Sequence, residues 1–248
     1  MSKPTIVLVH GAFADGTSSW RAVAGILIAR GYPVLAAANP LRGLHHDAES
    51  LRAVLAALTG PVVLVGHSYG GAVITSAATE SDTVTALVYV AAFAPDRGET
   101  AGELDERFAG QAQHVTTARP LPGADQAAPD GPPQVELTIL AAHFHEVFAP
   151  DIDPADAAVL AATQRPLALA GMLEPMGAPA WQRLPAYYVL ATRDQMIPVA
   201  GQRLMAERMQ ATTIEVATGH AAMLGAPEAI AELIIAAAKQ AQISREHG

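Results

Sequence analysis

The stretch Gly66-His67-Ser68-Tyr69-Gly70-Gly71 decides the fold that this sequence predicts. It directly follows the apolar run at residues 62–65 and opens a segment with helical spacing at 70–79. A serine on a tight turn from a strand into a helix needs very small neighbours, because the two backbones nearly touch there. Gly66 and Gly70 meet that need, so we interpret Ser68 as a candidate nucleophile.

The position of Ser68 at the start of a helix favours the same interpretation, because backbone N–H groups at that end stabilise negative charge. The Gly-x-Ser-x-Gly pattern by itself is a weak signal. The alternative is a glycine-rich turn that contains an incidental serine. The strand before the turn and the helix after it favour the nucleophile.

Short apolar runs alternate with helical segments on both sides of this turn. The runs lack polar alternation and lie at residues 5–9, 33–38, 62–65 and 86–92. The segments with helical spacing lie at residues 18–30, 47–58 and 70–79. Strands without polar alternation are typical of a parallel sheet that is buried on both faces. The alternation therefore predicts an α/β fold with a mostly parallel, doubly wound sheet.

This rhythm is interrupted after residue 92. Residues 95–179 contain scattered Pro and Gly and no convincing buried strand, although apolar helical segments occur around 135–147 and 155–170. The strand pattern returns at 186–191 and 213–216, and residues 228–240 predict a closing helix. We therefore expect a core built from residues 1–95 and 181–248, with a mainly helical cap inserted at 96–180.

Composition excludes several classes of protein. The 248 residues are 51% hydrophobic and 16% charged, which predicts one large packed core. A net charge of −9 argues against a nucleic-acid partner. The absence of cysteine excludes disulfides, thiolate catalysis and cysteine metal sites. Only two lysines are present, Lys3 and Lys239, which argues against a Schiff-base or phosphate-loop lysine.

The beginning of the chain bears on its location. The apolar stretch at residues 6–9 is too short for a signal peptide or a membrane span. We expect a soluble cytoplasmic protein with no membrane partner, and we leave open export by an unusual route and assembly into a homodimer.

The run His10-Gly11-Ala12-Phe13, at the end of the first strand, is a candidate oxyanion loop. Acyl transfer needs two N–H donors aimed at the developing oxyanion. One donor should be the N–H of Tyr69, directly after the nucleophile, and the other should come from this early loop. We assign the second donor to Ala12, with Phe13 as the alternative. A phosphate loop is the rival interpretation, but Thr17 occupies the position of its essential lysine.

A general base and its acid are expected downstream of Ser68. His220 follows the strand at 213–216, at the same sheet edge as Ser68. Asp194 follows the strand at 186–191 and fits the chain order Ser, Asp, His. A helix cap before Pro198 is the alternative role for Asp194, and Asp96 is the competing acid.

The other histidines receive structural interpretations. We expect His10 to shape the oxyanion loop and His67 to pack beside the turn. His143-Phe144-His145-Glu146 and the pair His45-His46 lack a matching set of ligands with metal-site spacing, so we predict no metal.

Together these motifs resemble the α/β-hydrolase superfamily. The resemblance rests on residues 7–16 with Trp20, on residues 66–71, on Asp194 with Ile197-Pro198, and on residues 220–224. More narrowly, the chain resembles the branch that holds plant methylesterases, plant hydroxynitrile lyases and their bacterial esterase relatives. The cap is looser in its similarity, at residues 143–148 and 164–166.

The resemblance implies that Ser68 is the nucleophile, His220 the base and Asp194 the residue that orients it. It also implies oxyanion donors at Ala12 and Tyr69 and no cofactor. Lyases of one stereochemical type carry a lysine directly after the catalytic histidine, where this chain has Ala221. The same lyases have threonine where this chain has Gly11, and both differences favour hydrolysis.

The resulting hypothesis is a carboxylesterase that cleaves small esters through an acyl-enzyme. Lyase chemistry, lactone opening, carbon–carbon hydrolysis or a receptor-like binding role on the same fold are the alternatives. Apolar side chains of the cap and the oxyanion loop are candidates for the substrate pocket. They are Phe13, Phe144, Phe148, Met172, Leu173, Met176 and Trp181.

Overall fold

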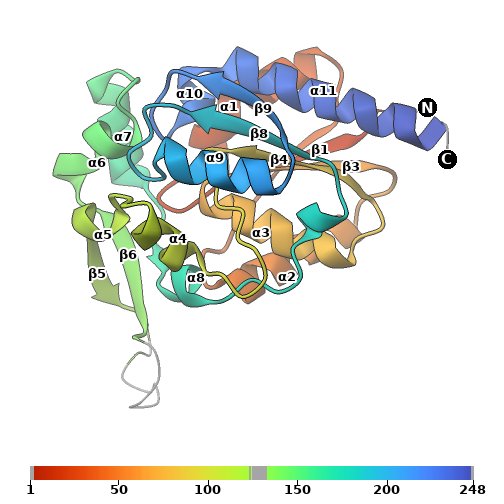
Figure 1. The fold of residues 1–248 in the computed structure, drawn as a ribbon. Helices are drawn as coiled ribbons and strands as arrows, with labels where there is room; N and C mark the ends of the chain where they lie inside the picture. The colour runs from red at the N-terminus through yellow and green to blue at the C-terminus, as the bar shows by residue number, and fades with distance from the viewer. Residues whose placement is uncertain (1–2, 123, 125–132, 247–248) are drawn as a thin grey trace.

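The computed structural model describes residues 3–122, 124 and 133–246, and its centre is a six-stranded parallel sheet (Figure 1). The strand order is β2-β1-β3-β4-β8-β9. The strands are β1 (Thr5–Val9), β2 (Val34–Ala37), β3 (Val62–His67), β4 (Val84–Val90), β8 (Ala186–Ala191) and β9 (Thr212–Val216). They coincide with the six predicted runs to within two residues at each end, which confirms the predicted sheet.

Helices cover both faces of this sheet, which explains why its strands lack polar alternation. Every residue of β3 and β8 is buried. One face is covered by α1 (Gly16–Ala29) and α11 (Pro227–Glu246), with α10 (Ala222–Gly225) beside them. The other is covered by α2 (Leu44–Ala56), α3 (Tyr69–Ala77) and α9 (Val199–Arg208). The prediction of a doubly wound α/β fold is therefore confirmed.

The strand order places the loops after β1 and β3 side by side. β1 pairs with β2 on one side and with β3 on the other, with Val9 opposite Gly66. The chain therefore turns in opposite directions after neighbouring strands, and a crevice forms at their carboxyl ends. The oxyanion loop and the turn at Ser68 both begin at this crevice.

The chain leaves the sheet between β4 and β8 and builds a second, smaller unit there. It contains a three-stranded antiparallel sheet in the order β5-β6-β7, drawn in green at the lower left of Figure 1. Its strands are β5 (Thr116–Pro120), β6 (Val135–Ile139) and β7 (Leu167–Ala168). Its helices are α4 (Ala101–Arg107), α5 (Ala112–Val115), α6 (Ala141–Phe148), α7 (Pro154–Thr163) and α8 (Ala170–Leu173).

The sequence prediction missed this second sheet. Residues 135–147 were expected to be helical, but only the part from Ala141 is, because the first five residues form β6. In β6 the apolar Val135, Leu137 and Ile139 alternate with two polar residues. Such alternation is the signal of a half-buried strand. Short 3₁₀ turns at Ala78–Glu80 and Ala180–Gln182 complete the fold.

Helix α4 is held at its start by a capping box. The Thr100 hydroxyl accepts a hydrogen bond from the Glu103 N–H, and the Glu103 carboxylate accepts one from the Thr100 N–H. This reciprocal pair satisfies two of the N–H groups that a helix start leaves without partners. The helix ends near Phe108, where Ala109 takes a positive φ of 55°. These two ends fix the orientation of the short helix that carries Asp105.

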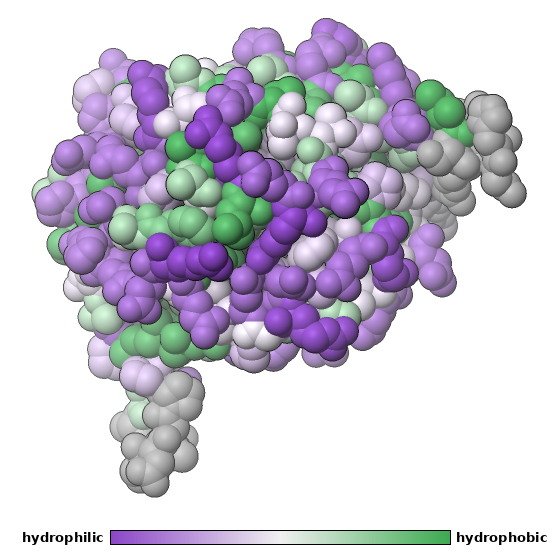
Figure 2. All heavy atoms as spheres, in the orientation of Figure 1, coloured by the Kyte–Doolittle hydropathy of each residue, from purple (hydrophilic) through white to green (hydrophobic). Residues whose placement is uncertain are grey.

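The surface is mixed in polarity. Hydrophilic side chains cover most of the face seen in Figure 2, and hydrophobic areas break through near its middle. Within the described residues, we find no helix with the length and hydropathy that crossing a membrane requires.

Candidate active site

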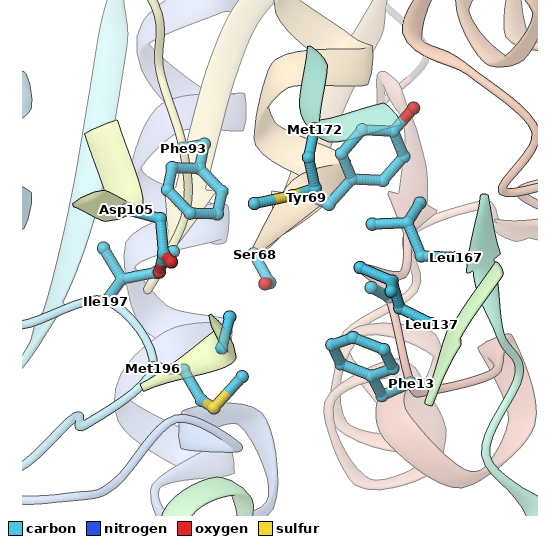
Figure 3. A pocket seen from close by; sticks show the side chains of 12 residues that line it. Phe13, Ser68, Tyr69, Phe93, Asp105, Leu137, Leu167, Met172, Met196 and Ile197 are labelled. Atoms are coloured by element: carbon cyan, nitrogen blue, oxygen red, sulfur yellow. The ribbon is translucent and has the colours of Figure 1, made fainter. Parts of the chain in front are cut away.

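The backbone at Ser68 has the strained conformation expected of a nucleophile turn. Its φ and ψ are 52° and −126°, a region that residues other than glycine rarely occupy. The Ser68 carbonyl accepts hydrogen bonds from the N–H groups of Gly71 (2.9 Å) and Phe93 (3.1 Å). These bonds hold the turn, and the side chain points into the open space at the centre of Figure 3.

The glycines around Ser68 are required by close backbone contacts. A Cβ atom at Gly66 would lie 2.6 Å from the Gly70 carbonyl oxygen. A Cβ atom at Gly70 would lie 2.6 Å from the carbonyl oxygen of Val9 on the neighbouring strand. Backbone atoms cannot move aside cheaply, so the expectation of very small residues at both positions is confirmed.

Three polar side chains from three loops form a continuous hydrogen-bonded series. The Oγ atom of Ser68 lies 2.9 Å from Nε2 of His220, and Nδ1 of His220 lies 2.8 Å from Oδ2 of Asp194. All three residues are buried. Because a carboxylate only accepts hydrogen bonds, Nδ1 carries the proton and Nε2 is left to accept one from the serine hydroxyl.

Asp194 is held in place by further donors. Its Oδ1 atom accepts hydrogen bonds from the N–H groups of Met196 (2.8 Å) and Ile197 (3.0 Å). Its Oδ2 atom accepts a third from Nε2 of Gln202 (2.9 Å). Gln202 is fully buried in α9 and also bonds Ala191, so it ties the carboxylate to the end of β8. No sequence motif marks Gln202, and the sequence analysis missed it.

Asp96, the competing acid, is not part of this series. Its carboxylate accepts hydrogen bonds from the N–H of Arg97 (2.7 Å) and from the side chain of Gln182 (3.3 Å). Among the described residues His220 contacts Asp194 and not Asp96.

His67 packs beside the turn, as the sequence predicts. Its Nε2 atom donates a hydrogen bond to the carbonyl of His220 (3.0 Å), and the two rings lie 4.7 Å apart. Burial lowers the pKa of His67 well below its ordinary value, and the nearby His220 lowers it further. His67 is therefore neutral and anchors the backbone of His220.

His10 shapes the loop after β1. Its Nδ1 atom donates to the Gly11 carbonyl (2.9 Å), and its Nε2 atom accepts from the N–H of Asn39 (3.2 Å). Burial lowers the pKa of His10, which keeps the ring neutral and suited to these two roles. The side chain of Asn39 donates back to the carbonyl of His10 (3.0 Å).

The N–H groups of the expected oxyanion donors, Ala12 and Tyr69, differ from that of Phe13, the alternative donor, in whether they already make a hydrogen bond. The N–H of Phe13 already donates to the carbonyl of Arg165 at 3.0 Å. The N–H groups of Ala12 and Tyr69 have no hydrogen-bond partner within the described part of the chain. This difference favours Ala12 over Phe13.

Ser68 opens into a cavity (Figure 3). Most of its lining side chains are apolar. They come from the oxyanion loop, the nucleophile turn, the second sheet and the loop after β8. The cavity is lined by Ala12, Phe13, Ser68, Tyr69, Phe93, Asp105, Ala112, Leu137, Leu167, Met172, Met196 and Ile197.

Of the seven predicted pocket residues, Phe13 and Met172 line this cavity. Leu173 is 46% exposed and lines an adjoining hollow instead. The other four do not line this cavity, because each packs against another part of the protein. Phe144 packs against Phe148, and the Phe148 ring also contacts the His220 ring. The N–H of Met176 donates to the Glu99 carbonyl, and the indole N–H of Trp181 donates to the Pro95 carbonyl.

The sequence analysis also missed several lining residues. Met196 and Ile197 stand two and three residues after Asp194, so their place in the motif could have indicated them. Leu137 and Leu167 lie on β6 and β7, which were not predicted. Asp105 carries no sequence signal, because it is one acidic residue in a helix that contains two others.

The remaining histidine clusters do not assemble a metal centre. His145 donates from Nε2 to the Ile152 carbonyl at 3.0 Å, and His46 lies 3.3 Å from the Asp47 carboxylate. Within the described ranges we find no group of three or more His, Asp or Glu arranged to hold a metal ion. The loop at residues 11–18, which resembles a phosphate loop in its spacing, leads into α1. The Asp15 carboxylate caps this helix by accepting hydrogen bonds from the N–H groups of Thr17 and Ser18.

Comparison with known proteins identifies the family of this chain. The profile of the alpha/beta hydrolase family matches residues 6–233. A pyrethroid hydrolase from Sphingobium wenxiniae (strain DSM 21828 / CGMCC 1.7748 / JZ-1) is 30% identical over 94% of this chain and 87% of its own. The chain therefore belongs to the alpha/beta hydrolase family. The predictions of a hydrolase and of a likeness to bacterial esterases are confirmed.

Solved structures establish the same fold. The structure of polyneuridine aldehyde esterase matches with a TM-score of 0.80 at 19% identity, over 95% of this chain and 99% of that one. A methylesterase from Arabidopsis matches with a TM-score of 0.76 at 18% identity, over 94% and 98%. The predicted likeness to methylesterases is thus confirmed at the level of the fold.

Proposed function

We propose that this hydrolase cleaves small carboxylic esters through an acyl-enzyme on Ser68. The observation that carries the proposal is the contact of 2.9 Å between Ser68 Oγ and His220 Nε2, with Asp194 on the other side of the imidazole. A serine hydroxyl is a weak nucleophile until a neighbouring base takes its proton. The relatives named above as a pyrethroid hydrolase and as methylesterases support ester chemistry.

In the first step Ser68 attacks the ester carbonyl while its proton passes to His220. The negative charge that develops on the carbonyl oxygen is held by the N–H groups of Ala12 and Tyr69. Asp194 keeps Nδ1 protonated and stabilises the imidazolium. His220 then protonates the departing alcohol, and the acyl group stays on the serine.

In the second step water replaces the alcohol. His220 removes a proton from the water, which attacks the acyl carbonyl, and the acid is released as the proton returns to Ser68. This scheme needs no cofactor or metal. The apolar lining of the cavity, with Phe13 and Met172, suits aryl or alkyl substituents of the ester. The unit at residues 96–180 acts in this proposal as the cap that closes the pocket.

Labelling with a fluorophosphonate tests the proposal. We expect stoichiometric label on Ser68 alone, measured by intact mass and peptide mapping, because no other serine whose side chain the structure describes has this base beside it. Ser68→Ala should remove the label. Ser76→Ala, eight residues further along in α3, should keep it. Label on a different serine, or none on folded protein, would contradict the proposal.

A further inference from the structure

Asp105 is a buried carboxyl group whose two oxygens lack a hydrogen-bond partner among the described residues. The residue is 3% exposed, and neither carboxylate oxygen makes a hydrogen bond of ordinary geometry with a described residue. It lies on α4, and its carboxyl group faces the same cavity as the Ser68 hydroxyl (Figure 3). A buried carboxyl that lacks partners costs free energy, which a structural role alone does not explain.

The surroundings of Asp105 contain no basic side chain on the cavity wall. It is the only acidic or basic residue among the twelve that line the cavity. In Figure 3 it stands across from Phe13, Leu137 and Leu167, with the Ser68 hydroxyl between the two walls. A molecule that bonds Ser68 at its ester carbonyl therefore has one apolar side and one side that faces a carboxyl group.

The groups around Asp105 do not offset the effect of burial on its pKa. Burial raises its pKa, and the charges of His114 and His220 and the amide of Gln113 lower it by smaller amounts, so the pKa stays raised at about 6. The Asp105 carboxylate and the Met196 carbonyl oxygen both lie close to Gly110, where each would crowd a Cβ atom. An ionised carboxylate only accepts hydrogen bonds, so Asp105 favours a ligand that donates them.

The hollow next to the cavity is also lined by acidic side chains. An adjoining hollow shares Asp105, Ala112, Leu137 and Met172 with the cavity, and it is also lined by Glu103 and Glu106 from the same helix. Acidic residues at an entrance raise the local concentration of cations. The whole chain adds to this effect with a net charge of −9.

We infer that Asp105 binds an amino group of the ester substrate, through an N–H hydrogen bond to its carboxylate. The substrate class is thus an ester with an amine on one arm, and a protonated amine fits best. Its positive charge stabilises the ionised carboxylate that burial disfavours. This inference rests on the proposed ester hydrolysis at Ser68.

Matched esters test the inference. The panel consists of ethyl phenylacetates and benzyl acetates, so that the arm lies in the acyl part or in the alcohol part. Each carries a para substituent in isosteric pairs: aminomethyl against ethyl, for the protonated amine, and amino against methyl, for the neutral N–H. We expect wild-type kcat/KM to be about tenfold or more higher for the aminomethyl ester than for its ethyl partner in at least one series.

The variants separate binding from structure. Asp105→Leu should abolish the preference or reverse it, because it leaves an apolar wall. Asp105→Asn should keep part of the preference for the neutral amine and lose most of it for the protonated one. Asp82→Asn, which removes an exposed charge at the amino ends of the strands, should leave both ratios within about twofold. Binding of the same esters to Ser68→Ala by calorimetry repeats the comparison without turnover.

The two proposals fail in different ways. Equal rates and equal binding for the isosteric partners, or a preference that survives in Asp105→Leu, would overturn the role of Asp105 while ester hydrolysis stands. A wild-type protein that is not labelled at Ser68 and hydrolyses no ester would overturn the proposed function, whatever the calorimetry shows.

Discussion

The Nε2 atom of His220 lies 2.9 Å from the Oγ atom of Ser68, although 152 residues separate the two in the chain. β3 delivers the serine and the loop after β9 delivers the histidine. The strands are parallel, so their carboxyl ends meet at one edge of the sheet. Four predictions follow from this edge and from the side chains around it.

Asp194→Asn should lower kcat for a small aryl ester by about 10⁴-fold, because an amide no longer fixes the proton on Nδ1 of His220. Asp96→Asn is the matched control and should change kcat only mildly, since its carboxylate bonds Gln182 and its own loop. Steady-state kinetics of both variants check this ranking. The reverse order would assign the acid to Asp96.

Hydrolysis should dominate over cyanohydrin cleavage. A lyase stabilises a small leaving anion with a cation beside the histidine, and here that neighbour is the buried, uncharged Ala221. Arg165, the nearest candidate cation of the cap, lies 3.4 Å from His10 and does not line the cavity. We expect turnover of nitrophenyl acetate that metal chelators do not change, with negligible cleavage of mandelonitrile. Cyanide release without ester turnover would count against the esterase.

Gly70→Ala should destabilise the protein by about 1–3 kcal/mol, because its Cβ atom would lie 2.6 Å from the Val9 carbonyl oxygen. Gly25→Ala is the control, since nothing lies within 4 Å of a Cβ atom there. On the exposed side of α1 it should stabilise by about 0.5–1 kcal/mol. Urea unfolding measures both. Equal effects would mean that the close contact at the turn is not rigid.

Asp105→Asn should stabilise the folded protein at neutral pH. Burial raises the folded-state pKa of Asp105 from 3.8 to about 6, so ionisation costs the wild type stability as the pH rises through that range. The variant should match the wild type near pH 4 and exceed it by about 1–3 kcal/mol above pH 7. Urea unfolding at the two pH values measures the difference.

Asp82→Asn removes an equal charge elsewhere and controls for net charge. A variant Asp105→Asn that is less stable at both pH values would show that Asp105 supports the fold, through groups such as Gln113. Increased stability combined with loss of the amine preference would instead mark a side chain kept for binding at a cost in stability.

Local patterns in the sequence were sufficient for the core. The runs at residues 5–9 and 186–191 are apolar throughout because both faces of their strands are covered, and this leaves a mark in consecutive residues. The glycines around Ser68 are also a local signal, because they are required by the close contact between a strand and the helix that follows it. Ser68, Asp194 and His220 each follow a predicted strand of the parallel sheet, so the sequence also predicts that their loops meet at one edge.

Tertiary structure decided what depends on contacts between distant segments. The hydrogen bond from the Phe13 N–H to the Arg165 carbonyl, which favours Ala12 as the proposed oxyanion donor, joins distant segments, and the position of Asp194 depends on Gln202 in the next helix. Asp105 faces Ser68 only because α4 is placed over the cavity. Such contacts are set by packing and by the angles at which elements meet. Neither has a period that consecutive residues could reveal, so the lining of the pocket lay beyond the sequence.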